Sequence, residues 1–144
     1  MDMLALKLCD IQGRLFGLSG KAGYSSEEFI RKFMNSEVAR GLDSSYNRYQ
    51  WAGEEYLLEE LEDCFRFSSK GNIYPNEVLY WTGYIYRFWH YCKGTESREI
   101  VKTAPPETMR RNFLLFHTMD PELAIEDLLE IKNQAEQEKQ AVAE

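Results

Sequence analysis

The sequence repeats one pattern of residues in its two halves, and this repeat limits the folds that the chain can adopt. The first copy reads I-Q-G-R-L-F-G-L-S-G from position 11, then S-S-E-E-F-I-R-K-F and later G-E-E-Y-L-L-E-E-L. The second reads I-Y-R-F-W-H-Y-C-K-G from position 85, then E-S-R-E-I-V-K and D-P-E-L-A-I-E-D-L. The equivalent pairs are Ile11 and Ile85, Gly20 and Gly94, Ser26 and Ser97, Glu28 and Glu99, and Leu61 and Leu128. The repeat predicts two similar units of three to four helices each, packed as a pseudo-symmetric bundle.

The spacing of apolar residues predicts an all-α fold. Between positions 2 and 18, leucine and isoleucine recur at gaps of three and four residues, which places them on one face of a helix. We expect further helices from Ser25, over 53–65, over 75–93, over 97–103, from Pro106 and from Pro121, with a short helix or turn over 46–51. No segment alternates apolar and polar residues for long enough to predict a strand.

Several residues predict where these helices begin and end. Gly20 is a candidate left-handed cap for the first helix, and Gly94 is predicted to end the helix over 75–93. Ser25 and Glu28 have the spacing of a capping box. Gly41 is expected to interrupt the weaker pattern over 35–45, and Asp120 is expected to cap the last helix.

The same signals predict the domain organisation. We expect a first helical unit over 1–67, a linker over 68–74, and a second unit over 75–132 that packs on the first to give one compact domain. From Asn133 to Glu144 large apolar residues are scarce, so this stretch is expected to fray into a solvated polar tail.

Charge and composition exclude several classes of function. The net charge of −7 is unsuited to a general binder of duplex DNA or of an anionic membrane surface. The three cysteines lack the spacing of a zinc site, and no glycine-rich phosphate loop or nucleophile motif occurs, so we expect no metal, no cofactor and no enzyme activity. Without a signal peptide or an apolar run of membrane length, the chain is predicted to be cytoplasmic.

The two histidines and the clustered charges each allow more than one interpretation. His90 and His117 fit structural or surface roles, contact with a partner, or acid–base chemistry, and His117 could bond the end of its own helix. The acidic run over 54–63 is either a solvated helix face or a surface for a basic partner. The bases between Arg87 and Arg111 are matched to an acidic partner, are part of a helix-turn-helix over 97–113, or have no special role.

The aromatic helix over 75–93 is predicted to lie in the middle of the bundle, because apolar residues cover much of its circumference. It also holds more Tyr and Trp than a core requires, and these residue types are enriched in binding interfaces. The candidate partner-binding residues are Tyr84, Arg87, Trp89, His90, Arg98, Arg110 and Arg111.

The phrases W-A-G-E-E-Y-L-L-E-E-L-E-D and F-H-T-M-D-P-E-L-A-I-E-D-L, each after an S-x-E-[FI] helix, resemble small helical proteins of gut Firmicutes. Members of that family are often encoded beside predicted ADP-ribosyltransferase-like toxins. The resemblance covers most of the chain from Leu8 to Leu129 and implies an antitoxin-like partner of such a toxin. Its motifs are caps and core positions, so it implies no catalytic residues.

We therefore expect a non-catalytic cytosolic interaction protein that binds and restrains a partner protein, with a homodimer as a further expectation. The alternative is a transcriptional regulator or DNA-binding adaptor that uses the segment 97–113. A third hypothesis is an enzyme whose site is assembled from dispersed residues such as His90, His117, Tyr84 and Glu99.

Overall fold

The computed structural model describes residues 1–143 and is all-helical, with no β-strand in that range. Eight α-helices and one short 3-10 helix follow one another along the described chain. In order, they are α1 (Met3–Lys21), α2 (Ser26–Met34), α3 (Glu37–Asp43), η1 (Arg48–Trp51), α4 (Glu54–Cys64), α5 (Asn76–Lys93), α6 (Ser97–Thr103), α7 (Pro106–Phe116) and α8 (Pro121–Ala143).

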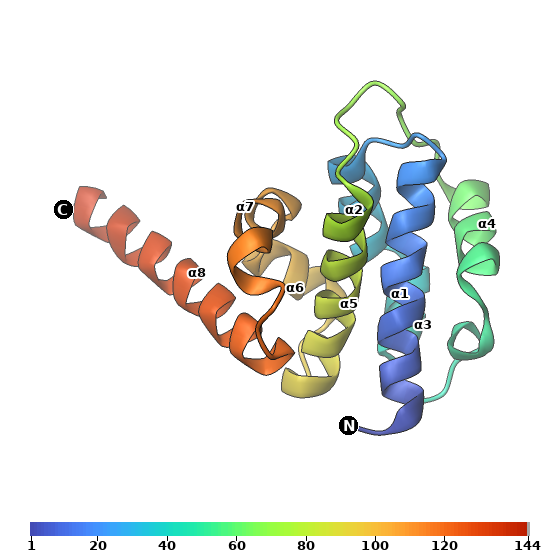
Figure 1. Cartoon of the computed structure of the whole chain (residues 1–144), viewed down its shortest axis with the longest axis horizontal. Helices are drawn as coiled ribbons and strands as arrows, with labels where there is room; N and C mark the ends of the chain where they lie inside the picture. Colours follow the sequence, from blue (N-terminus) through green and yellow to red (C-terminus); the bar gives the residue numbers. More distant parts are fainter. Residues whose placement is uncertain (144) are drawn as a thin grey trace.

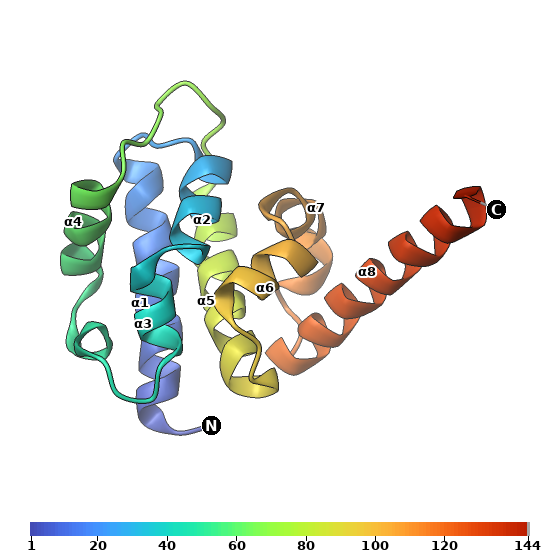
Figure 2. The same cartoon turned by 180° about the vertical axis from the view of Figure 1, so that it is seen from behind.

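The two long helices α1 and α5 lie side by side in opposite directions at the centre of the molecule (Figure 1). Helix α4 packs on the outer side of α1, whereas α7 and the first turns of α8 pack beside α5. Helices α2, α3 and α6 cover the other side of the central pair, which faces the viewer in Figure 2. The second half of α8 projects away from this body.

Glycine allows the central helices to approach closely. A Cβ atom on Gly83 of α5 would lie 2.5 Å from the Gln12 carbonyl oxygen and 2.9 Å from the Gly13 Cα. A Cβ atom on Gly13 would lie 2.8 Å from the Tyr80 carbonyl oxygen. Side-chain carbons do not tolerate such distances to backbone atoms, so this crossing requires glycine on both helices.

Helix α5 occupies the middle of the bundle, as its apolar circumference predicts. It contacts α1, α6, α7 and α8. Trp81, Tyr86 and Trp89 are buried, whereas Tyr80, Tyr84 and Tyr91 are half-buried. The aromatic residues therefore divide between the core and one partly open face.

Helix α2 begins where predicted, after Ser25, but three of the predicted end signals do not act as expected. Helix α1 continues through Gly20 to Lys21, and the left-handed residue is Gly23, with φ 84°. Ser25 precedes α2 but forms no side-chain capping bond. The backbone N–H groups at this helix start are bonded to the loop before α5 instead: Ser25 N–H donates to the Ser68 carbonyl and Ser26 N–H to the Asn72 carbonyl. Gly41 does not break the chain but lies inside α3.

Other end signals are confirmed. Gly94 adopts a left-handed conformation (φ 72°) and ends α5. The Asp120 carboxylate accepts a hydrogen bond from the Glu122 N–H at the start of α8. The loop between α4 and α5 contains the predicted linker 68–74.

The C-terminal stretch differs from the prediction. Residues 133–143 continue α8 instead of fraying, and their side chains are exposed. The end of the predicted polar tail, Glu144, lies outside the described residues. None of the helices within residues 1–143 combines the length and the apolar character that a bilayer span requires.

Candidate partner-binding surfaces and the cleft between α3 and α6

Arg87, one of the predicted partner-binding residues, lies in the interior instead. Its side chain is 0% exposed, and its Nη1 is 2.6 Å from Oδ1 of Asp43 on α3. Its Nε donates to Oε1 of Gln12 on α1 at 2.9 Å, and the Gln12 amide nitrogen donates to the Gly83 carbonyl at 3.0 Å. A buried charge requires a partner and full hydrogen bonding, and both are supplied here.

Asp43 extends this buried network to α6. Its Oδ1 accepts a hydrogen bond from the Ser97 hydroxyl at 2.8 Å, and its Oδ2 accepts one from the Ser97 backbone N–H at 2.9 Å. Nη2 of Arg87 donates to the same hydroxyl at 3.2 Å. One arginine and one aspartate thus hold α1, α3, α5 and α6 in a fixed arrangement.

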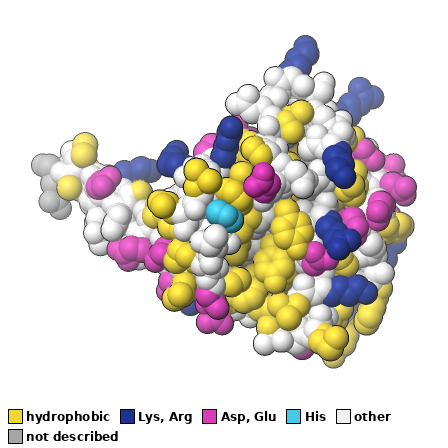
Figure 3. Space-filling model, viewed as in Figure 1, with side chains coloured by type: hydrophobic (Ala, Val, Ile, Leu, Met, Phe, Trp, Pro, Cys, Tyr) yellow, Lys and Arg dark blue, Asp and Glu magenta, His cyan; other side chains and the backbone are white. Residues whose placement is uncertain are grey.

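Trp89 is also unavailable to a partner, since its ring is 2% exposed. Tyr84 is half-buried on the open side of α5, where its ring lies 6.1 Å from that of Tyr80 and 6.3 Å from that of Phe88. Partial burial raises the pKa of Tyr84, with smaller contributions from the nearby Cys9 and Asp10. Hydrophobic side chains gather over this side of the molecule in Figure 3.

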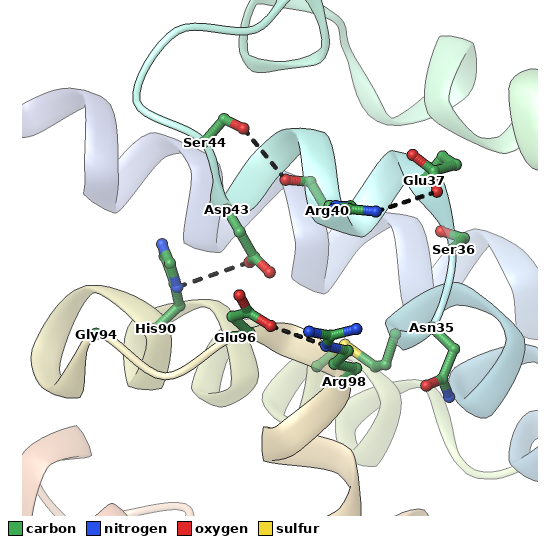
Figure 4. Close-up of a pocket in the computed structure, with 11 residues that line it drawn as sticks. Asn35, Ser36, Glu37, Arg40, Asp43, Ser44, His90, Gly94, Glu96 and Arg98 are labelled. Carbon is green, nitrogen blue, oxygen red and sulfur yellow. Dashed lines mark hydrogen bonds and ion pairs between the residues drawn. The ribbon is translucent and has the colours of Figure 1, made fainter.

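His90 and Arg98 come together in a cleft of about 520 Å³ between α3 and α6 (Figure 4). Arg40 lines the α3 wall and Arg98 the α6 wall. The complete lining is Met34, Asn35, Ser36, Glu37, Arg40, Asp43, Ser44, His90, Gly94, Glu96 and Arg98. Because the Thr95 carbonyl can only accept, the hydrogen bond of 2.8 Å to His90 places a proton on Nδ1. We call this space the α3–α6 cleft.

Arg110 and Arg111 lie on the exposed side of α7, together with two leucines. Leu114 is 81% exposed and Leu115 is 73% exposed. Residues three and four positions apart share one helix face, so Arg111, Leu114 and Leu115 adjoin one another. We call the set Arg110, Arg111, Leu114 and Leu115 the α7 face.

The seven predicted binding residues therefore do not form one site. Two are buried, two line the α3–α6 cleft, two belong to the α7 face and Tyr84 lies on α5. Leu114 and Leu115 escaped prediction because Met109 and Phe113 already supply the buried side of this helix. The sequence does contain a signal for these two leucines: they are apolar residues at helix positions outside the buried side.

Some of the remaining charged groups are paired with one another. Lys93 pairs with Glu126 of α8, and Lys102 pairs with Glu99 of α6. In the acidic helix α4, Glu54 lies 3.9 Å from Arg14 and Glu62 accepts a hydrogen bond from the Tyr24 hydroxyl. The side chains of Glu55, Glu59 and Asp63 are exposed to solvent.

The second histidine has a local role. The ring of His117 stacks on Phe113 with centroids 4.3 Å apart, and its Nδ1 bonds the Phe113 carbonyl at 2.8 Å, which confirms the predicted bond to the end of its own helix. In the part of the chain that the structure describes, no three His, Cys, Asp or Glu side chains are grouped so that they could hold a metal ion. Comparison with protein-family models, with curated proteins and with solved structures found no match to this chain.

Proposed function

We propose that this protein is a non-catalytic interaction protein that binds a partner protein through the α7 face. The observation that carries the proposal is the exposure of Leu114 and Leu115 on neighbouring positions of one helix. Leu123 in the first turn of α8 is also exposed, at 58%. Burial of each leucine side chain is worth about 1.5–3 kcal/mol, so a partner that covers this face gains substantial affinity.

The arginines of the α7 face favour a partner with acidic and apolar groups together. Arg110 lies over the ring of Tyr74, with its guanidinium carbon 4.8 Å from the ring centroid. Arg111 is exposed and forms no ion pair within the described residues. Arginine is one of the residue types enriched in protein interfaces and in their binding hot spots.

The resemblance to proteins encoded beside toxins supplies a candidate partner, the product of a neighbouring gene. In this proposal the protein binds that product and restrains it in the cytoplasm, as an antitoxin does. The test is co-expression of the tagged full chain with the neighbouring product, followed by affinity capture. Leu115→Glu and Arg111→Glu are expected to abolish or strongly weaken capture, because they place an acidic group in the contact.

Met3→Glu is the matched control, because Met3 is 88% exposed and belongs to the first turn of α1 rather than to α7. Capture should survive this change. Equal capture by all four proteins would contradict the role of the α7 face. No capture by the unaltered chain would contradict the choice of partner.

A second candidate function is DNA binding through α6 and α7, since Arg110 and Arg111 are presented to solvent on the second helix of this pair. It takes second place because Arg98 and Lys102 on the first helix pair with Glu96 and Glu99. A gel shift with promoter DNA at low salt tests it, because low salt favours phosphate contacts. Absence of a shift would exclude this function.

We also propose that the two units arose by duplication and that the protein forms a homodimer. The order of the helices supports the duplication, because α1 is followed by the shorter helices α2, α3 and α4, and α5 by the shorter helices α6 and α7. A superposition of 3–64 on 76–131 tests it by asking whether one rotation relates the two sets of helices. A light-scattering mass in solution tests the homodimer.

A further inference from the structure

We infer that the α3–α6 cleft binds a small hydroxylated anion, such as a sugar phosphate, with the phosphate held between Arg40 and Arg98. This site shares no residue with the α7 face and does not depend on the proposed partner. Its volume of about 520 Å³ is in the range of small-molecule sites.

The two arginines border the same space from different helices. Figure 4 shows Arg40 along the α3 wall and the Arg98 guanidinium directed from α6 into the space between the helices. An anion bound between these two walls would contact guanidinium groups from both helices. Their planar forks also match the oxygens of phosphate and carboxylate.

The present partners of these arginines are weakly held. Arg40 lies 3.7 Å from Glu37, with side chains 77% and 86% exposed. Arg98 lies 2.8 Å from Glu96, with side chains 62% and 57% exposed. Ion pairs this exposed contribute little to stability, so both guanidinium groups are free to turn toward a bound anion.

The acidic and polar side chains of the lining favour a ligand that carries hydroxyl groups in addition to the anionic group. Once the arginines turn to the anion, the carboxylates of Glu37 and Glu96 become acceptors for hydroxyl donors, and Ser36 and Ser44 add further polar groups. The only large apolar residue in the lining is Met34, and none of the lining residues is Phe, Tyr or Trp. This lining favours a polyhydroxylated ligand over one with an aromatic base.

The buried Arg87–Asp43 pair gives the cleft a rigid base. Asp43 lines the cleft and is bonded to Arg87 of α5 and to Ser97 of α6, so the two walls keep their separation. A site held in place before binding loses less free energy to ordering when the ligand arrives.

The experiment is calorimetric titration of the full chain with glucose 6-phosphate, inorganic phosphate and glucose. We expect saturable binding of glucose 6-phosphate, weaker binding of phosphate and none of glucose. The double variant Arg40→Gln and Arg98→Gln should weaken glucose 6-phosphate binding about tenfold or more, since each lost hydrogen bond to a charged group corresponds to about one such factor. Arg66→Gln is the matched control, because Arg66 is exposed and lies outside the cleft, and this variant should bind as the unaltered chain does.

A second variant separates the two parts of the site. Glu37→Gln with Glu96→Gln frees the arginines and replaces two charged acceptors by weaker, neutral amide oxygens. Phosphate binding should therefore strengthen, while the preference for glucose 6-phosphate over phosphate falls. No binding of glucose 6-phosphate, or equal binding by the Arg40/Arg98 variant and the unaltered chain, would overturn the inference. Phosphate binding as tight as that of glucose 6-phosphate would overturn it too.

Discussion

At the scale of single residues, the most consequential contact is the buried pair of Arg87 and Asp43. The arginine is fully buried and bonded to side chains from α1, α3 and α6. Such a pair adds little net stability compared with apolar residues of the same volume, but loss of one partner leaves the other charge uncompensated. The main effect of the pair is therefore to determine which helices pack together, and its contribution to the stability of the fold is small.

Replacement of Arg87 by Met tests this role. We expect Arg87→Met to lower the free energy of unfolding by about 3–5 kcal/mol, because Asp43 then remains largely buried without a cation. Urea unfolding followed by tryptophan fluorescence measures the change. Arg98→Met, at an exposed ion pair, should alter stability by less than about 0.5 kcal/mol. Equal effects of the two substitutions would show that the buried pair does not have this role.

Sequence reasoning could not find this pair, although it could find many helix ends. Gly94 and Asp120 act on neighbouring residues, so local spacing is enough to predict them. Arg87 meets Gln12 across 75 positions of the chain and Asp43 across 44. Only the folded arrangement brings these groups together, and an arginine on a helix otherwise resembles a surface residue.

At the scale of helices, the crossing of α1 and α5 depends on the absence of side chains at Gly13 and Gly83. The pattern of apolar residues predicted both helices, but it gave no measure of how closely their axes approach. The two glycines indicate how close the helix axes are, because each glycine faces the backbone of the other helix.

Gly83→Ala is expected to destabilise the protein, although alanine is the better helix former. The new Cβ would lie 2.5 Å from a backbone oxygen of α1, so the helices must separate, at a cost of about 1–3 kcal/mol. Gly20→Ala is the matched control, because its Cβ would meet side-chain atoms rather than backbone, Leu79 Cδ1 at 2.7 Å and Ile73 Cγ2 at 3.6 Å. Thermal unfolding should show a lower midpoint for Gly83→Ala alone, and an equal loss in both variants would contradict the close crossing.

The two halves of α8 are expected to differ in their contribution to stability. Ala124, Ile125 and Leu128 are buried against the body, whereas Val142 is 88% exposed on the projecting half. Leu128→Ala should cost about 2–5 kcal/mol, and Val142→Ala less than about 0.5 kcal/mol. Amide hydrogen exchange should be fast over 133–143, since a short helix without tertiary contacts is marginal in water. Strong protection of this segment in dilute solution would indicate that a partner covers it.

At the scale of the whole molecule, the two predicted units are joined by the long helices α1 and α5. The most extensive contact between helices is that of α1 with α5, so each unit completes the core of the other. The first unit also reaches the second through α2 with α7 and through Arg31, whose Nη2 lies 2.7 Å from Glu107. The buried apolar residues of both units belong to one hydrophobic cluster.

This arrangement predicts that the chain unfolds in a single step. Fluorescence reports on Trp81 and Trp89 in α5, and the reactivity of the buried Cys9 thiol reports on α1; the two should give the same urea midpoint. The fragment 1–74 should lack a folded core, because residues such as Leu8, Leu15 and Phe16 would lose the cover of α5, and circular dichroism would show little helix. Separate midpoints, or a helical fragment with its own cooperative transition, would instead mean that the first unit is an independent domain.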